Sequence, residues 1–254
     1  MKTVVVTGAA QGVGLATATL FAKQGYHVVL TDIQPLDRQL ADLMAAGYLA
    51  SAITGDVASE AFAEDLAAQV IGDQGRIDVL VNNAGISLIQ AAENTSLDQW
   101  NRVMAINLAG PFLLCRAFGR HMLSQGHGNI VNVTSIAGLH GVIHRAAYNS
   151  AKHGLIGLTR TLAAEWGGRG VRVNAVCPGW IKTEMDIADQ QKGAYGDADI
   201  VNRVPMARFA TPEDVAAAIL FLGRDGSFVN GINLPVDGGW TSDASWDALR
   251  LATR

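Results

Sequence analysis

The chain has little of several residue types that mark other classes of protein. It holds two cysteines among 254 residues, and Cys115 and Cys177 lie far apart, without a CxxC pair or histidines at metal-ligand spacing. We therefore expect two buried thiols in a reducing compartment and no metal site. Charged residues make up 17% of the chain and its net charge is −4. No basic stripe occurs, so nucleic acid is not expected as a partner.

Long hydrophobic runs are also missing. No stretch of about 18 apolar residues occurs, which argues against a transmembrane helix and a membrane partner. The N-terminal run Met1–Val6 stops at Thr7-Gly8, too early for the apolar region of a signal peptide. Apolar residues nevertheless make up 49% of the chain, so disorder is not expected. The expectation is a soluble, cytoplasmic protein.

Short β-branched runs alternate with longer helical stretches along the chain. The runs do not alternate polar with apolar residues, so we expect strands covered on both faces, joined by βαβ crossovers into a parallel sheet. The predicted fold is α/β, a single doubly wound Rossmann domain over residues 1–254, with a parallel seven-stranded sheet and helices on both faces. The predicted strands are Lys2–Thr7, His27–Asp32, Leu49–Thr54, Asp78–Asn82, Asn129–Thr134, Val171–Cys177 and Gly231–Val236.

Local signals mark two helix starts and two less regular segments. Thr95 is a candidate cap with an acid, Asp98, three positions on, and Thr211–Asp214 offers a cap, a proline and two acids. The polar segment 184–208 predicts a mobile lid over a site. Residues 240–254 form a tail beyond the last strand, which could cover a neighbouring subunit or dock on its own chain.

The first predicted strand runs directly into a glycine-rich turn, TGAAQGVG. Gly8, Gly12 and Gly14 allow the backbone to turn tightly and approach a pyrophosphate, and the helix that follows directs its N-terminal amides at the phosphates. The spacing is GxxxGxG, not the commoner GxGxxG, and a tight turn without a ligand is the alternative. The strand–turn–helix context favours dinucleotide binding, with Gln11 and Val13 also in contact.

An acid closes the second predicted strand. Asp32 lies 18 positions after the glycine at position 14, close to the spacing of a carboxylate that binds the adenosine ribose. The carboxylate would repel a 2′-phosphate, and Gln11 and Ile33 carry no charge, so we predict NAD rather than NADP. Asp56 and Val57 follow the third strand. Asp56 could bind the adenine amino group, or it could be a turn residue or a helix cap.

Tyr148 and Lys152 stand four positions apart on a predicted helix and therefore share one face. A neighbouring cation lowers the pKa of a phenol from about 10. With the positive charge of an oxidised nicotinamide, the tyrosine could take a proton from an alcohol while hydride leaves its carbon. Such pairs also arise on solvated helices. Ser135 lies 13 positions before position 148, at the strand end where ligands bind in such folds.

In this order the motifs resemble those of the short-chain dehydrogenase/reductase family over essentially the whole chain. The resemblance implies that Tyr148 is the general acid/base, that Lys152 lowers its pKa and holds the nicotinamide ribose, and that Ser135 orients the substrate oxygen. It also implies that Asn107 holds a water in a proton relay. The matching motifs are TGxxxGxG, Asn82-Asn83-Ala84-Gly85, Asn107, Ser135, Tyr148 with Lys152, Pro178–Thr183 and Val236–Gly239.

The same resemblance extends to cofactor contacts and assembly. It places Asn83, Ala84 and Gly85 beside the adenosine and its ribose. It places Pro178, Gly179, Ile181 and Thr183 at the nicotinamide, with Ile181 near the carboxamide and Thr183 near the phosphates. A homotetramer is implied, joined through helices near Gly110–Gln125 and Tyr148–Trp166. Independently, Ala151, Gly154 and Gly157 would let another helix approach, or pack on this chain's own sheet.

The substrate side is the least defined part of the sequence. His144 or Arg145, if directed inward, would suit a hydroxylated or anionic substrate, although a surface loop is the alternative. The expected activity is NAD-dependent interconversion of a secondary alcohol, of polyol, sugar or hydroxy-acid type, with its ketone. Two alternatives are a 3-oxoacyl-thioester reductase that uses NADPH and a non-catalytic NAD-sensing protein. The candidate substrate contacts are Ser135, Val142, His144, Tyr148, Trp180 and Met185.

Overall fold

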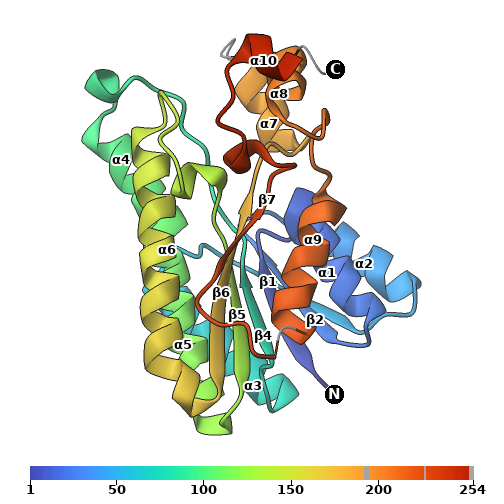
Figure 1. Cartoon of the computed structure of the whole chain (residues 1–254). Coiled ribbons are helices and arrows are strands. Elements are labelled where there is room, and N and C mark those ends of the chain that lie inside the picture. The colour runs from blue at the N-terminus through green and yellow to red at the C-terminus, as the bar shows by residue number, and fades with distance from the viewer. Residues whose placement is uncertain (192–194, 226, 252–254) are drawn as a thin grey trace.

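The computed structural model describes residues 1–191, 195–225 and 227–251, and its centre is a parallel sheet (Figure 1). The seven strands have the order β3-β2-β1-β4-β5-β6-β7, and every neighbouring pair is parallel. The chain thus winds outward in two directions from β1 and β4, as the sequence predicted. The strands are β1 Thr3–Thr7, β2 His27–Asp32, β3 Ala50–Thr54, β4 Val79–Asn82, β5 Gly128–Val133, β6 Val171–Pro178 and β7 Asn233–Val236.

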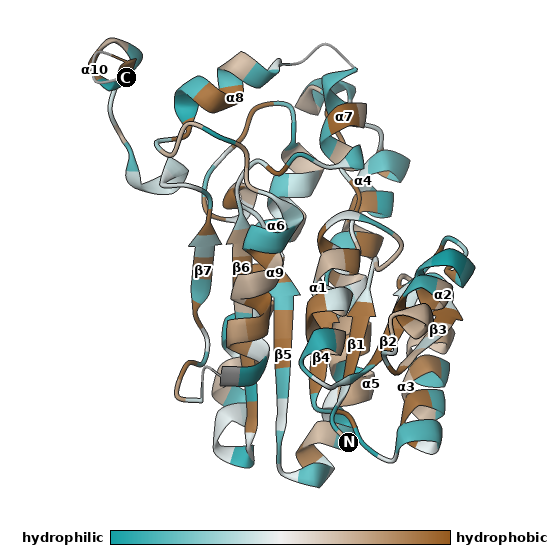
Figure 2. Ribbon diagram, turned by 90° about the vertical axis from the view of Figure 1, so that its right-hand side faces the viewer, coloured by the Kyte–Doolittle hydropathy of each residue, from teal (hydrophilic) through white to brown (hydrophobic). Residues whose placement is uncertain are grey.

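Helices cover both faces of the sheet. One core cluster joins the strands to α1 (Gly12–Lys23), α2 (Asp37–Ala45) and α9 (Pro212–Leu220). The other joins them to α3 (Glu60–Gln74), α5 (Gly110–Gln125) and α6 (Ala146–Trp166). Figure 2 shows the hydrophobic strands between these two layers. Because both faces are covered, runs such as Val4-Val5-Val6 are wholly buried, and this explains why the strands lack alternation.

Capping residues fix the helix starts, and one of them differs from the prediction. Thr211 caps α9 with Asp214 in a reciprocal capping box, as expected. The cap of α4 (Leu97–Met104) is Ser96, not Thr95, and its partner is Gln99. Gln99 Oε1 accepts from the Ser96 amide at 2.9 Å and the Gln99 amide donates to Ser96 Oγ at 3.2 Å. This reciprocal pair decides between two adjacent residues that could each cap.

The less regular segments lie above the carboxyl ends of the strands (Figure 1). Within the expected lid, α7 (Glu184–Gln190) and α8 (Asp197–Arg203) are short helices, and residues 192–194 lie outside the described residues. In the tail, the Trp240 ring packs 5.7 Å from the His140 ring of its own chain. Farther on, α10 (Asp247–Leu251) follows Trp246, which is 71% exposed, and residues 252–254 are not described.

Two further observations bear on the sequence analysis. Both cysteines are buried free thiols, as expected. Among the described residues, none of the helices has the length and apolar character that a membrane span requires.

Candidate active site

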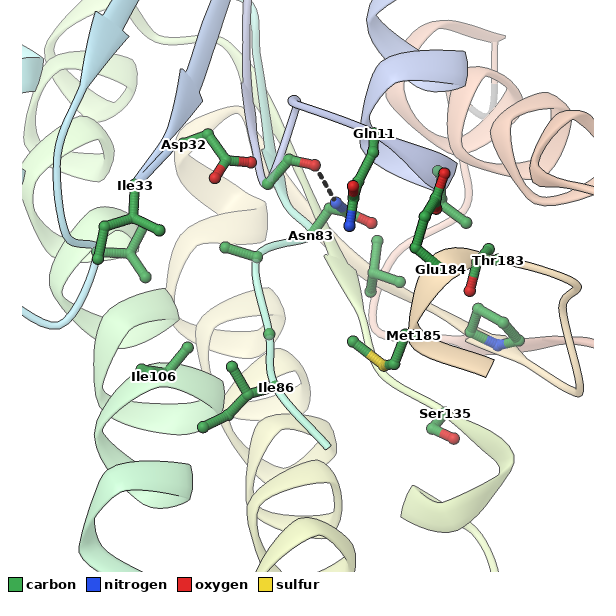
Figure 3. A pocket seen from close by; sticks show the side chains of 18 of the residues that line it. Gln11, Asp32, Ile33, Asn83, Ile86, Ile106, Ser135, Thr183, Glu184 and Met185 are labelled. Carbon is green, nitrogen blue, oxygen red and sulfur yellow. Dashed lines mark hydrogen bonds between the residues drawn. The ribbon is translucent and has the colours of Figure 1, made fainter. Parts of the chain in front are cut away.

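A pocket runs along the carboxyl ends of the central strands and collects most of the predicted cofactor contacts. Figure 3 shows Asp32 and Ile33 at one end of the residues drawn, Ser135 at the other, and Thr183, Glu184 and Met185 along one side. The predicted residues that line it are Gly8, Gln11, Gly12, Val13, Asp32, Ile33, Asp56, Val57, Asn83, Ala84, Gly85, Ser135, Tyr148, Lys152, Pro178, Ile181, Thr183 and Met185.

Two predicted contacts, Gly14 and Gly179, are not among the lining residues. A Cβ on Gly14 would lie 1.9 Å from the carbonyl oxygen of Gly8, and one on Gly179 would lie 2.9 Å from the Cα of Asp237. Both glycines are therefore required because backbones approach closely there. They allow the backbone segments behind the pocket to pack closely, but they do not themselves line the pocket.

Residues Thr7 and Asn83 hold the glycine-rich turn against the end of β4. The Asn83 side-chain amide donates to the carbonyls of Thr7 and Gly8 at 3.0 and 3.1 Å. The Thr7 hydroxyl accepts from the amides of Asn83 and Ala84 at 3.0 and 2.9 Å. Since buried backbone groups must be paired, this network fixes the turn in an open shape, with the start of α1 facing the pocket.

The Asp32 carboxylate is fixed at the far end of the pocket by backbone donors. The Ala10 amide donates to Oδ2 and the Gln34 amide to Oδ1, both at 3.0 Å. Each carboxylate oxygen can accept more than one hydrogen bond, so capacity for two ribose hydroxyls remains. The Asp56 side chain makes a turn, accepting from the Ala58 amide at 2.9 Å, while its residue also lines the pocket.

Tyr148 and Lys152 project from the first turns of α6 toward the end of β5. The Lys152 ammonium donates to the Val133 carbonyl at 2.9 Å and lies 5.6 Å from the centre of the Tyr148 ring. Ser135, directly after β5, lines the same pocket. The structure therefore brings a phenol, an ammonium and a hydroxyl together at one end of the pocket, as the motif predicted.

Burial dominates the ionisation of this group. It raises the pKa of Tyr148, against the lowering effects of the Ser135 hydroxyl and of the Arg145 charge. Burial also lowers the pKa of Lys152 to about 8. The direction for Tyr148 is the opposite of the one expected from the sequence. The reason is that desolvation of the phenol, with a smaller contribution from the Asp189 charge, outweighs the groups that lower its pKa.

Asn107 lies in a π-helical turn (Ala105–Ala109) between α4 and α5 and is fully buried. Its side chain bonds the Ile86 backbone at both ends: Nδ2 donates to the carbonyl at 2.8 Å and Oδ1 accepts from the amide at 2.9 Å. A Cβ on Gly85 would lie 3.1 Å from Asn107 Oδ1 and 3.7 Å from Lys152 Nζ. The Asn107 side chain and the Lys152 ammonium therefore both lie next to Gly85.

Comparison with known proteins agrees with this geometry. A family model described as enoyl-(acyl carrier protein) reductase matches residues 8–241. D-threitol dehydrogenase of Mycolicibacterium smegmatis is 42% identical over 246 residues, which cover 94% of this chain and 93% of the relative. The chain belongs to the short-chain dehydrogenase/reductase family. It is accordingly an oxidoreductase that acts on CH–OH groups with a nicotinamide cofactor.

Other members of the family that resemble this chain have different activities. The 3-oxoacyl-[acyl-carrier-protein] reductase of Synechocystis is 39% identical over 239 residues, with 92% of this chain and 94% of the relative covered. A solved structure of actinorhodin polyketide ketoreductase with NADPH is 34% identical, with a TM-score of 0.91 and coverage of 95% and 98%. Overall similarity therefore establishes the family and the fold. The substrate and the choice of cofactor have to be inferred from the residues of the site.

A second, smaller pocket adjoins Ser135 and Tyr148 on the side away from Asp32. The predicted substrate contacts Val142, Trp180 and Met185 line it, but His144 does not. His144 is exposed with a φ of 60°, and its carbonyl accepts from the Gln90 amide at 2.7 Å. Because the backbone at His144 is left-handed, the next residue, Arg145, lines the pocket and His144 does not.

Sequence reasoning missed several residues of the two pockets. Gly55, Ile86, Arg102, Ile106 and Glu184 line the larger one, and Asp186, Asp189 and Tyr195 line the smaller one. Ile86 follows the NNAG motif and Glu184 follows Thr183, so adjacency to a motif could have found these two. Asp186 and Asp189 carry no such signal, because the packing of α7 over the site brings them in.

Proposed function

We propose that this enzyme interconverts a secondary alcohol, of polyol, sugar or hydroxy-acid type, with its ketone, and that it uses NAD. The observation that carries the proposal is the placement of Tyr148, Lys152 and Ser135 at one end of a pocket whose other end holds Asp32. A nicotinamide cofactor bound along this pocket would supply the hydride acceptor for alcohol oxidation.

In this proposal Tyr148 takes the hydroxyl proton of the alcohol, and Ser135 orients the same oxygen by a hydrogen bond. Lys152 holds the nicotinamide ribose. Its charge, together with that of Arg145, favours the phenolate once the substrate is bound. Asn107 commits its side chain to Ile86, so we propose that its main chain holds the relay water. A π-helical turn disrupts the regular backbone hydrogen bonding and leaves room for such a role.

Asp32 supports the choice of NAD. Its carboxylate faces the pocket beside Ile33 and Gln34, both uncharged, and would oppose a 2′-phosphate. Arg102 lines the pocket from α4. It offers the cation that a 2′-phosphate would need, if it turns toward Asp32. The related ketoreductase holds NADPH, and rates with NAD⁺ and NADP⁺ test the preference of this enzyme.

The second candidate function is reduction of a 3-oxoacyl thioester with NADPH. Its support is the relative from Synechocystis, which is 39% identical. A non-catalytic NAD-sensing protein is a third candidate. The complete set of Asn107, Ser135, Tyr148 and Lys152 disfavours it, because a sensor has no need of a proton-transfer group.

We further propose a cytoplasmic homotetramer. Two buried free thiols agree with a reducing compartment. Gly157 on α6 faces open space, as a contact between subunits would need, and Phe112 on α5 is 44% exposed. Gly154, by contrast, packs on Leu108 of its own chain, so it does not support the interface.

The test is a set of initial rates followed at 340 nm. Polyols, sugars, hydroxy acids and simple secondary alcohols are each offered with NAD⁺ and with NADP⁺, and acetoacetyl thioesters with NADH and NADPH. Turnover of an alcohol class with NAD⁺ is the predicted result. Turnover of thioesters with NADPH alone would overturn the proposal in favour of the second candidate.

A further inference from the structure

The smaller pocket beside Tyr148 has a charge pattern that the general reaction does not require. Its described lining includes one cation, Arg145, and two acids, Asp186 and Asp189. Arg145 lies directly before α6, three residues before the catalytic tyrosine, and both acids lie on α7 of the lid. All three are almost completely buried. Because burying charge is costly, their placement calls for an explanation.

Arg145 and Asp189 are locked in a closed triangle with Ser87. Arg145 Nη2 donates to Asp189 Oδ2 at 3.0 Å and Nη1 donates to Ser87 Oγ at 2.7 Å. The Ser87 hydroxyl in turn donates to Asp189 Oδ2 at 2.8 Å. The guanidinium charge is thus neutralised within the protein and is not offered alone to a substrate.

Two aromatic rings hold the guanidinium of this triangle in place. Its Cζ lies 5.8 Å from the centre of the Tyr148 ring and 5.7 Å from that of Trp180. A guanidinium carries five N–H donors, and the triangle uses one on each terminal nitrogen. The remaining donors and the neighbouring carboxylates give the pocket wall both donating and accepting groups within reach of the reacting phenol.

Asp186 adds a further acceptor. Its Oδ1 accepts from the Tyr195 hydroxyl at 2.9 Å, and its Oδ2 is buried without a hydrogen bond, with Lys182 Nζ at 3.5 Å. Lys182 also pairs with Asp197 outside the pocket, at 2.5 Å. Asp186 thus gives the pocket wall a second carboxylate, which can accept a hydrogen bond from a ligand that brings a donor.

We propose that Arg145, Asp189 and Asp186 form a specificity site that accepts an uncharged polyhydroxy alcohol and rejects a carboxylate substrate. The inference rests on the proposed function and narrows it. A hydroxyl group both donates and accepts, so it can satisfy the guanidinium and the acids together. A carboxylate only accepts, and it would add a further negative charge where both nearby cations, Arg145 and Lys182, are already paired with acids.

The experiment compares D-threitol with D-threonate, which differ in one terminal group: CH₂OH in the first and carboxylate in the second. The cofactor is the one the wild-type enzyme uses in the rate panel. The wild type should have at least about 100-fold higher kcat/KM for threitol. Asp189→Asn removes the acid and releases the Arg145 charge, so the ratio should narrow at least about tenfold, mainly through a lower KM for threonate.

The control is Asp199→Asn, the same change in the exposed first turn of α8 on the same lid, where the asparagine oxygen can still accept from the Gly196 amide. It should leave the ratio as in the wild type. The double variant Arg145→Gln/Asp189→Asn should not show the lower KM for threonate that Asp189→Asn shows, because it lacks the Arg145 cation. Circular dichroism and melting temperature identify variants that fold.

The outcomes separate the two claims. A wild type that oxidises both compounds but prefers threonate overturns the inference alone. So does a folded Asp189→Asn variant whose ratio is unchanged. A wild type that oxidises no alcohol with either cofactor overturns the proposed function, and the specificity site with it.

Discussion

Replacing Lys152 by methionine should change how the stability of the fold depends on pH. Burial lowers the pKa of this ammonium to about 8 in the folded chain, from the usual 10.5. Below pH 8 the folded and unfolded chains both hold the proton. Between about 8 and 10.5 only the unfolded chain holds it, so stability rises with pH across this window.

The magnitude follows from the gap between the two pKa values. At about 1.4 kcal/mol per pH unit the whole gap corresponds to about 3 kcal/mol, of which about 2 kcal/mol falls between pH 7 and pH 9.5. Methionine cannot titrate, so the Lys152→Met variant lacks this gain. Its lost hydrogen bond to the Val133 carbonyl shifts its stability by a constant amount at all pH values.

The assay is urea unfolding of both proteins at pH 7 and pH 9.5. The free energy of unfolding of the wild type should rise by about 2 kcal/mol relative to that of the variant. Lys23→Met, which removes an exposed lysine at the end of α1, is the matched control. A difference between wild type and Lys152→Met that stays constant with pH would refute the reasoning.

Three further predictions concern the cap, the turn and the lid. Thr211→Ala removes the cap of α9 and should cost about 1 kcal/mol of stability, measured by urea unfolding. Gly14→Ala places a Cβ 1.9 Å from the Gly8 carbonyl oxygen, so NAD⁺ binding by calorimetry should be lost; wild-type affinity would contradict this. Asp189 raises the pKa of Tyr148, so in Asp189→Asn the pH at which kcat rises with the ionisation of Tyr148 should be lower than in the wild type. An unchanged or higher pH for this rise would contradict the prediction.

Much of the fold could be predicted because its signals are local. Buried parallel strands are built from continuous β-branched runs, and the predicted strand Val171–Cys177 differs from β6 by one residue. The start of α4 was misplaced because Thr95 and Ser96 can both cap. Only the reach of Gln99 back to the Ser96 amide decides between them, and that contact depends on the backbone angle of the turn.

The cofactor side of the site was also accessible from sequence, whereas the substrate side was not. The glycine spacing and the ends of the strands determine where Asp32 lies in the fold, and the spacing of the YxxxK motif does the same for Tyr148. By contrast, the positive φ of His144 directs Arg145 to the pocket, and no sequence signal gives that angle. Asp189 reaches Arg145 across 44 positions of sequence, so their pairing follows from tertiary packing of the lid.

The most direct test of the account is the rate of alcohol oxidation by Tyr148→Phe. The substrate and cofactor are those that the wild type uses best. The phenylalanine keeps the ring and removes the proton-transfer group. The account predicts a fall in kcat of about 10²–10⁴-fold, with affinity for the nicotinamide cofactor within about twofold of the wild type. Turnover near the wild-type rate would contradict the role of Tyr148 and, with it, the proposed chemistry of the site.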